Sequence, residues 1–546
     1  MSLCKIEPEV TALVQPECLP YTAIPHTTRL FAEYSAHADA LREYYPSLSL
    51  LKDWAAASHL LRYDAGRRER VAGILERQNR EWNASPATLE SIARFRAGAS
   101  VMVTGQQVAL FGGPLFSLYK ALTAIKLAAE ATKSGTDCVP VFWLATEDHD
   151  LAEVNHVTLL DDGGRLHELS TPSQSAADAP VGTVRLGAEI EGVVQAAAQA
   201  LGSAEAEQFL RQSYRPGETL GSAFGRLFSL LFRDSGIVLL DASDPELHRI
   251  AEPVYRGAAL AAADLTSDLL RRSKALEAAG YHAQVKVTPS STLLFQIQNS
   301  ARSPIHRVNG GFQAGKEKLT AEALAARIVS QPEQFSANVL LRPVVQDYLL
   351  PTLAYVGGPA EVAYFAQASV VYEELLGRVT PVAPRLSATL IEPRVKRLLD
   401  RYRLAVPDAF HTAEQLRETL AHHSLPTGLD AEFNSAAASL GQSLDAVTAA
   451  LAGFDPTLAT AAGKARSKMS YQLERLRGRA ARAQMRRNQL LARHAEEISA
   501  SLYPHKDLQE RSIGGISFLA RYGTGLLLRL FDSAALDCPG HQIIHL

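Results

Sequence analysis

The sequence predicts an α/β fold, in which a parallel-sheet core carries small inserted connecting segments and a long antiparallel α-helical coiled-coil arm. Three observations support this class. Residues 101–150 contain a strand pattern, a glycine-containing turn, an apolar-faced helix and a second strand, which is the order of a βαβ unit. Residues 352–361 repeat the step from strand through glycine turn into helix. Beyond Pro407 the chain becomes rich in Ala and Leu with coiled-coil spacing.

The first 95 residues carry helical apolar spacing, broken early by Pro20 and Pro25. We expect them to cover one face of the sheet. In the βαβ unit that follows, apolar residues from Leu115 to Ala129 recur every three to four positions, as a helix packed on a sheet requires. The second strand, Val139–Ala145, is continuously apolar, which predicts burial on both faces.

Two insertions interrupt the core pattern. A hairpin is predicted around Asp162-Gly163, and a second small β element near 293–312. Between them, helices and the buried strand 236–241 resume the β/α alternation. The predicted segments are 1–95 (helical, packed on the core), 96–157 (first half of the core), 158–218 (inserted segment), 219–290 (core continued), 291–335 (second inserted segment), 336–406 (end of the core and connection), 407–502 (coiled-coil arm) and 503–546 (C-terminal helical segment that folds back on the core).

In the arm, apolar side chains from Phe433 to Phe454 alternate steps of four and three residues, which is an a/d heptad seam. The spacing continues after Asp455-Pro456, with polar interruptions. Because a turn marked by proline is too short to join parallel helices, we expect an antiparallel hairpin. Seams of this kind often pair with a second copy, so the arm also predicts a homodimer.

Composition limits the class of protein. A hydrophobic fraction of 47%, a charged fraction of 21% and a net charge of −3 indicate a packed globular chain with no general attraction to nucleic acid. Ten basic residues against one acidic residue between 464 and 493 suit a solvated helix face, or a surface that meets phosphate or an acidic partner. No apolar run approaches the roughly 20 residues that span a bilayer, and the N-terminus lacks a signal-peptide pattern, so we expect a cytoplasmic protein without membrane contact. The four cysteines are far apart, which predicts reduced thiols rather than disulfides or a zinc site.

The turn after the first strand lies where open α/β sheets bind ligands. Thr104, Gly105, Gln106 and Gln107 match neither a dinucleotide fingerprint nor a P-loop, and they suit substrate oxygens or a capped turn equally well. Gly113 belongs to the following Gly-Gly-Pro start of a helix, and helix N-termini attract anions. Together the two features favour substrate binding by these five residues.

The second strand runs into the acidic cluster Glu147, Asp148, His149 and Asp150. Three carboxylates around an imidazole are costly unless they are solvated, paired, metal-bound or used in proton transfer. We predict a catalytic acid/base site in which one or two of these side chains face the ligand, because strand neighbours alternate in direction. Asn155, close behind, is a further candidate for substrate contact. Whether a metal takes part is open, and no metal ligand is assigned, since no second His/Glu motif accompanies the cluster.

A third set of polar residues lies between 342 and 361. In it, Arg342 suits a carboxylate or phosphate and Glu361 suits an ammonium group, although a buried ion pair between domains would give the same pattern. The predicted substrate-binding residues of this region are Arg342, Gln346, Asp347, Tyr355, Gly357, Gly358 and Glu361.

These motifs together resemble the cysteine-adding enzymes of bacillithiol biosynthesis, the BshC family. The resemblance extends through the arm, and it rests on Val103–Gln107, Leu110–Leu115, Tyr119–Ala121, Pro140–Trp143, Glu147–Asp150, Arg342-Pro343, Leu349–Thr352, Tyr355–Glu361 and Leu508–Arg511. It implies a Rossmann-like core of the nucleotidylyl-transferase and class I synthetase type, two inserted connecting segments, and dimerisation through the arm.

The resemblance also implies a ligase activity, which joins the carboxyl group of cysteine to the amine of glucosaminyl-malate in the last step of bacillithiol synthesis. It further implies an adenine nucleotide, ATP or ADP, near the junction of core and arm. The residues assigned to the nucleotide by this resemblance are Pro384, Arg385, Tyr503, Gln509 and Arg511. Adenylate-forming relatives carry His-x-Gly-His after the first strand, where this chain has 104–107, so we assign that turn to substrate.

Two other functions remain open from the sequence. One is a different carboxylate–amine ligase or nucleotidylyl transferase on the same core, and the other is a coiled-coil assembly protein whose core senses a nucleotide. Amide formation needs an activated carboxyl, a deprotonated amine and exclusion of water. An acid/base cluster facing anion-binding turns meets those needs, and we therefore predict the cysteine ligase.

Overall fold

The computed structural model describes residues 16–546 except 38, 173–178, 299–300, 424–426 and 488. Contacts within the chain separate two compact units. The core unit comprises Met1–Thr389 and Glu510–Ile544, and the helical unit comprises Leu390–Gln509 and His545–Leu546. The chain therefore returns to the core unit after the helical unit.

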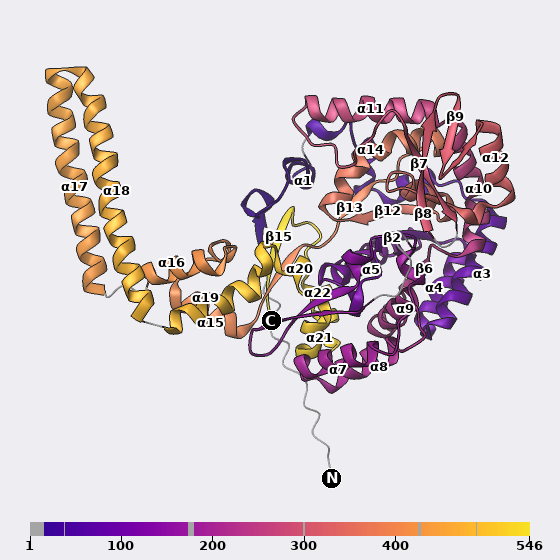
Figure 1. The fold of residues 1–546 in the computed structure, drawn as a ribbon, viewed down its shortest axis with the longest axis horizontal. Helices are drawn as coiled ribbons and strands as arrows, with labels where there is room; N and C mark the ends of the chain where they lie inside the picture. The colour runs from indigo at the N-terminus through magenta and orange to yellow at the C-terminus, as the bar shows by residue number, and fades with distance from the viewer. Residues whose placement is uncertain (1–15, 38, 173–178, 299–300, 424–426, 488) are drawn as a thin grey trace, which may run out of the picture. The chain divides into compact units, whose positions relative to one another are not determined.

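The core unit is built on a five-stranded sheet in the order β13-β12-β2-β3-β6 (Figure 1). Each neighbouring pair of these strands is parallel. The strands are β2 (Ser100–Gln106), β3 (Cys138–Leu144), β6 (Val238–Asp241), β12 (Thr352–Gly357) and β13 (Val382–Pro384). Their carboxyl ends meet at one edge, which confirms the predicted parallel-sheet core.

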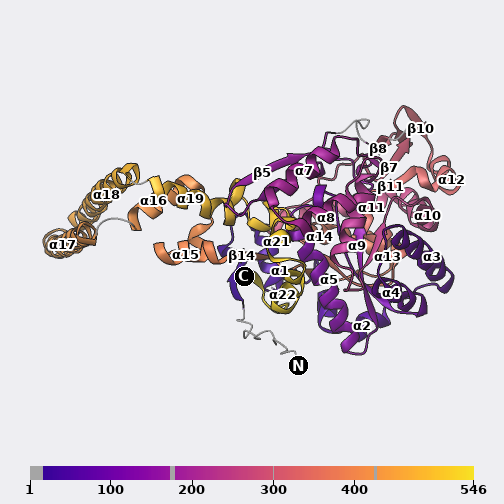
Figure 2. The same ribbon diagram turned by 90° about the horizontal axis from the view of Figure 1, so that it is seen from below.

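Helices surround this sheet, as two views of the ribbon show (Figures 1 and 2). All seven residues of β3 are buried, so the sheet is covered on both faces at its centre. The helices of this part of the core are α1 (Arg29–Ser35), α2 (Trp54–His59), α3 (Ala65–Glu81), α4 (Pro86–Ala97), α5 (Phe116–Lys133), α9 (Leu220–Leu231), α10 (Pro245–Leu260), α11 (Ala262–Ala278), α13 (Arg342–Leu349) and α14 (Pro359–Leu376).

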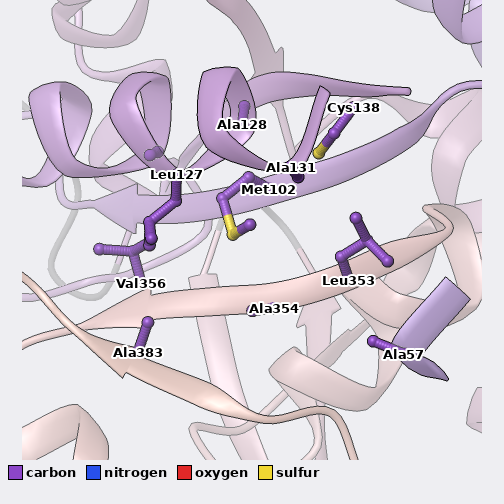
Figure 3. Close-up of a cluster of buried hydrophobic side chains, with 11 residues drawn as sticks. Ala57, Met102, Leu127, Ala128, Ala131, Cys138, Leu353, Ala354, Val356 and Ala383 are labelled. Carbon is purple, nitrogen blue, oxygen red and sulfur yellow. The ribbon is translucent and has the colours of Figure 1, made fainter. Parts of the chain in front are cut away.

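One apolar cluster shows how α5 is fixed on the sheet (Figure 3). Met102 of β2 lies among Leu127 of α5 and Leu353 and Val356 of β12, and all four are buried. Burying each such side chain contributes roughly 1.5–3 kcal/mol. This packing holds the C-terminal half of α5 against β2 and β12.

The two insertions carry their own small sheets. The first has the antiparallel pair β4 (His156–Leu160) and β5 (Leu166–Ser170), with α6 (Leu151–Val154) before it and α7 (Ile190–Leu201) and α8 (Ala204–Ser213) after it. The second is an antiparallel sheet in the order β10-β9-β8-β7-β11. Its elements are β7 (Ser291–Gln298), β8 (Ala301–Val308), β9 (Gly311–Ala314), β10 (Glu317–Leu319), α12 (Ala321–Ser330) and β11 (Phe335–Ala337).

The prediction of an all-helical C-terminal segment was wrong at its end. After α20 (Gln509–Ser512), α21 (Gly515–Tyr522) and α22 (Gly525–Ser533), the chain forms a strand, β15 (Gly540–His545). This strand lies between β1 (Glu17–Pro20) and β14 (Ala388–Ile391) in a three-stranded sheet. Its apolar run is short, and its strand partners lie far away in the sequence, so no local pattern could indicate it.

The expectation that all four cysteines are reduced was also wrong. Cys18 and Cys538 form a disulfide, with Cα atoms 6.1 Å apart, and only Cys138 is free and buried among the described cysteines. The bonded residues are separated by 520 positions. The antiparallel pairing of β1 with β15 brings them together, and sequence spacing alone gave no sign of it.

The helical unit contains α15 (Pro393–Tyr402), α16 (Ala413–His423), α17 (Thr427–Phe454), α18 (Pro456–Arg487) and α19 (Gln489–Leu502). Helices α17 and α18 run side by side and are joined at Asp455 (Figure 1). Ion pairs Arg466–Asp445 and Arg477–Asp430 cross between them. The later residue of α18 pairs with the earlier residue of α17, so the two helices run in opposite directions. This confirms the antiparallel hairpin. Over the residues described, no helix has the length and apolar character needed to cross a membrane.

Candidate functional site

A cavity of about 600 Å³ opens in the core unit at the carboxyl ends of the parallel strands. Its floor comes from the ends of β2, β3 and β12, and strands β7 and β8 of the second insertion add a further wall. Its polar and charged lining residues include Gln106, Gln107, Lys120, Glu147, Asp148, Arg302, Arg342, Glu361, Tyr364, Arg385 and Arg511. This is the position at which open α/β sheets bind ligands.

At the end of β2, Gln106 and Gln107 line the cavity and Thr104 does not. The Thr104 hydroxyl is fully buried and donates to the carbonyl oxygen of Val356 at 3.0 Å, so it joins β2 to β12. Gly105 also lines the cavity, and a Cβ on it would lie 3.1 Å from the carbonyl oxygen of Trp143. A side chain there would press on β3, which explains glycine at this position.

Lys120 of α5 is a functional candidate that sequence reasoning missed as an individual residue. Its side chain is 4% exposed, and Nζ lies 2.6 Å from Glu361 Oε2. It also donates to the carbonyl oxygen of Gly105 at 2.7 Å and to Gln106 Oε1 at 2.9 Å. Burial lowers the pKa of Lys120 to about 8, although the Glu361 carboxylate opposes that change. The only sequence signal was its place within the family motif 119–121.

Glu361 lies in the first turn of α14, just after β12. Its Oε2 accepts from the backbone N–H of Gly358 at 2.7 Å, and its Oε1 accepts from the Tyr355 hydroxyl at 2.5 Å. Burial favours the protonated acid, but the Lys120 charge and the Gly358 N–H outweigh it and lower the pKa of Glu361. Gly358 and Glu361 line the cavity, whereas Tyr355 and Gly357 lie behind them.

Arg342 at the start of α13 also lines the cavity. Its guanidinium group donates to the Tyr364 hydroxyl and lies 5.9 Å from the Tyr355 ring centroid. Burial disfavours its charge, but the oxygens of Tyr364, Tyr355 and Glu361 more than compensate, so its pKa is raised. Arg342 is therefore a fixed cation on the same side of the cavity as Lys120.

Only part of the acidic cluster that follows β3 lines the cavity. Glu147 and Asp148 line the cavity, while His149 and Asp150 do not. Asp148 accepts from Gln107 Nε2 at 2.7 Å, His149 accepts from Arg302 at 3.1 Å, and the Asp150 side chain caps α6. The structure thus brings two of the four predicted catalytic residues to the cavity.

Two residues near this cluster carried no sequence signal. Arg302 of β8 stacks 3.9 Å from the Phe295 ring centroid and donates to Ser336 and to the carbonyl oxygen of Ala337. His248 of α10 is buried, with Nε2 3.3 Å from Glu147 Oε1. Both are distant from residue 147 in sequence and reach it only through the fold.

Arg385 follows β13 and is held by a buried network. It donates to the carbonyl oxygen of Leu386 at 2.6 Å and to Glu510 at 2.7 Å. Glu510 also accepts from Ser387 at 3.0 Å, and the Ser387 hydroxyl lies 2.8 Å from His541 Nδ1. Burial lowers the pKa of His541 to about 4. Arg385 and Arg511 are the two predicted nucleotide-binding residues that line the cavity.

The remaining predicted residues lie elsewhere. Gln346 and Asp347 are buried, and Asp347 accepts from Gln346 and from the Tyr372 hydroxyl. The side-chain amide of Gln509 accepts from the backbone N–H of Leu390 and donates to the carbonyl oxygens of Leu390 and Ser501. All three residues belong to the helical unit. The cavity lining also leaves out Gly113, Asn155, Pro384 and Tyr503. Among described residues, no group of three or more His, Cys, Asp and Glu side chains is arranged to hold a metal ion.

Acidic and basic side chains of the cavity lie beside different strands of the sheet. Glu147 and Asp148 form an acidic wall beyond β3, and the Arg302 guanidinium of β8 lies beside both carboxylates. Lys120, Arg342, Arg385 and Arg511 form a basic wall on the side of β12 and β13, with Glu361 paired to Lys120. Such a cavity can hold one ligand that carries an amine and carboxylates, with the amine toward the acidic wall.

Comparisons with known proteins match this chain over both units. Residues 15–386 match the N-terminal Rossmann-like domain of bacillithiol biosynthesis BshC, and residues 388–546 match its C-terminal coiled-coil domain. A Koribacter versatilis protein is 51% identical over 97% of this chain and 99% of its own length. Solibacter usitatus and Salinibacter ruber proteins are 39% and 32% identical over 96% of this chain, and over 99% and 97% of their own lengths. All three are named as cysteine ligase BshC, and the chain belongs to the BshC family, as its motifs predicted.

Proposed function

We propose that this protein is a ligase that joins the carboxyl group of cysteine to the amine of glucosaminyl-malate, the last step of bacillithiol synthesis. Family membership and the names of its relatives support this reaction over the two other functions that the sequence left open. The observation that carries the proposal is the division of charge in the cavity, because the acceptor has an amine at one end and two carboxylates at the other.

On this proposal, the acceptor lies across the edge of the sheet. The malate carboxylates contact Arg342 and Arg385 on the basic wall, and Lys120, whose three N–H donors already have protein acceptors, adds positive charge beside them. The amine contacts Glu147 and Asp148, and the amide groups of Gln106 and Gln107 bind the sugar between them. Charge-assisted hydrogen bonds of this kind fix orientation, which supplies much of the advantage of an intramolecular reaction.

ATP is the proposed energy source, because a free carboxylate does not acylate an amine at neutral pH. Arg385 and Arg511 line the cavity and carry charge suited to phosphate oxygens, although both amino groups of Arg385 also have protein acceptors. Gln509 fits a nucleotide poorly, because its amide is already hydrogen-bonded within the helical unit. ATP enters here as a substrate of the reaction.

The experiment is a product assay. Purified protein is incubated with cysteine, glucosaminyl-malate and ATP, and the amide is detected by mass spectrometry. We expect product only when all three substrates are present, together with cleavage of ATP. Conversion of ATP and another acid or amine, with no cysteinyl product, would contradict the proposal and favour a different ligase.

We further propose a homodimer formed through α17 and α18. Among described residues, these helices leave large apolar side chains exposed, including Val447 at 50%, Phe454 at 85% and Leu476 at 55%. Covering such a stripe with a second copy would remove it from water. Light scattering at micromolar concentration should give the mass of a dimer, and Val447→Glu with Leu476→Glu should give a monomer. A monomeric wild type would contradict this part of the proposal.

A cytoplasmic location completes the proposal, since ATP and the substrates are supplied there. Cell fractionation should recover the protein with cytoplasmic markers. Fractionation is a demanding test of this location, because the Cys18–Cys538 disulfide is of a kind that reducing compartments such as the cytoplasm disfavour. Recovery in an extracytoplasmic fraction would contradict the location.

A further inference from the structure

Glu147 and His248 form a buried pair at the acidic wall, and the positions of their polar atoms indicate that the pair carries an additional proton. The His248 ring is 3% exposed, and its Nδ1 lies 2.8 Å from the carbonyl oxygen of Phe335. Its Nε2 lies 3.3 Å from Glu147 Oε1. Glu147 also lines the cavity, and among described residues its Oε1 has no hydrogen bond of good geometry.

The carbonyl of Phe335 can only accept, so Nδ1 of His248 must carry a hydrogen. A neutral ring would then have a lone pair on Nε2, 3.3 Å from a carboxylate oxygen, and the two would repel each other. One additional proton removes this conflict. Carried on Nε2, it makes an imidazolium that faces a carboxylate, with the carboxylate open to the cavity.

The surrounding charges favour this arrangement. Arg302 of β8 and Arg342 of α13 favour the ionised carboxylate, while Asp241 of β6 opposes it. Burial is the largest influence and raises the pKa of Glu147, and the charge of His248 is the largest influence that lowers it. Tyr255 of α10 also faces the pair, and its pKa is raised well above the ordinary value by burial, so it stays protonated. The net effect is a pKa of Glu147 above that of a carboxylate in water, so its carboxylate is the more basic of the two.

We propose that Glu147 accepts the proton of the substrate ammonium group and that His248 is the positioning residue that keeps Glu147 ionised and oriented. This inference rests on the proposed ligase function, because it assigns the base for the same amine. Neither residue needs to move, since Glu147 already faces both the cavity and the imidazole.

In the proposed step, one N–H bond of the ammonium group breaks and its proton moves to a Glu147 oxygen, while the electron pair stays on nitrogen. That pair forms the C–N bond with the cysteine carboxyl carbon, which ATP has activated. The bond from this carbon to the leaving oxygen breaks, and its electrons leave with the oxygen. The second N–H proton is lost as the amide forms and is taken by the leaving group or by water.

The test measures the carboxyl group directly. Protein labelled with carbon-13 at glutamate side chains is titrated by NMR, and the signal lost in Glu147→Gln identifies Glu147. In His248→Asn, whose amide can still donate to Phe335, we expect the midpoint of that signal to move to higher pH, because the imidazolium is gone. His248→Gln serves if His248→Asn does not fold, and His282→Asn, at an exposed position, is the control.

The dependence of kcat/KM on pH should follow the same change. We expect its acidic limb to move to higher pH in His248→Asn in step with the carboxyl midpoint, and not to move in His282→Asn. An unchanged midpoint would overturn the pair itself. A moved midpoint with an unmoved acidic limb would overturn its role in ligation. If the wild type formed no amide at all, the proposed function would fail and the assigned role with it, while the NMR titration would still decide whether the pair exists.

Discussion

The two walls of the cavity are built in different ways. The acidic wall comes from one stretch of chain, Glu147 and Asp148 directly after β3, supported by Gln107 and His248. The basic wall is assembled from four separate places, with Lys120, Arg342, Arg385 and Arg511 each in a different segment. Burial raises the pKa of Glu147 on the acidic wall, whereas on the basic wall ion pairs with Glu361 and Glu510 hold Lys120 and Arg385 in place. We infer that the first wall is suited to proton transfer and the second to binding, and each can be tested separately.

The largest effect should come from the acidic wall. In Glu147→Gln we expect kcat to fall by about 10²–10⁴-fold, the range for loss of a general base, with a smaller loss of affinity for glucosaminyl-malate because Asp148 still contacts the amine. Steady-state kinetics with separate binding measurements checks this. Glu130→Gln, on the exposed face of α5, is the matched control. A fall in affinity without a fall in kcat would place Glu147 among the binding groups instead.

The second prediction concerns the stability of the buried network that holds Arg385 in the basic wall, of which His541 is a member. Burial lowers the pKa of His541 to about 4 from its ordinary 6.5, so the unfolded chain binds the proton first as pH falls. This group should therefore remove about 3 kcal/mol from the free energy of unfolding between pH 6.5 and 4. Urea denaturation at several pH values measures it, and His541→Gln should lose less stability than the wild type over that interval. Equal losses in both proteins would show that His541 does not carry this dependence.

A smaller effect should come from removing one cation of the basic wall. In Arg342→Met we expect affinity for glucosaminyl-malate to fall by about 10- to 100-fold, since hydrogen bonds to charged groups contribute roughly 1.5–3 kcal/mol. Calorimetry measures the dissociation constant, and Arg342→Lys should recover part of the loss because it keeps the charge. If both variants bind as the wild type does, the carboxylates do not contact Arg342.

The smallest effect should be a pH dependence of binding. Burial lowers the pKa of Lys120 to about 8, so its charge is present below that pH and lost above it. With malate as the probe, we expect affinity to weaken by up to about tenfold per pH unit above pH 8. Lys120→Met should bind malate more weakly and show a flatter profile. An identical profile in the variant would assign the pH dependence to another group.

The difference between the walls also explains what the sequence could predict. The strand–turn–helix pattern placed β2, β3 and β12 correctly, and the acidic cluster is visible because its members are consecutive. His248 and Arg302 could not be found in this way, because α10 and the second insertion bring them to residue 147 from a distance. Strand β15 and the Cys18–Cys538 bond escaped detection for the same reason.

Polar residues inside a motif were harder to interpret than the motif itself. Thr104, Gln346 and Asp347 lie in predicted binding stretches, but their side chains satisfy buried partners within the fold. Lys120 shows the opposite case, since its position on α5 looked like part of a packed helix and its amine reaches the cavity. Only the direction of each side chain separates these cases, and direction follows from packing.

The most direct test of the account is a crystal structure with glucosaminyl-malate bound. We expect the amine nitrogen within about 3.2 Å of a Glu147 oxygen and the malate carboxylates against Arg342 and Arg385. A ligand bound in the reverse direction, or outside this cavity, would contradict the division of labour between the two walls.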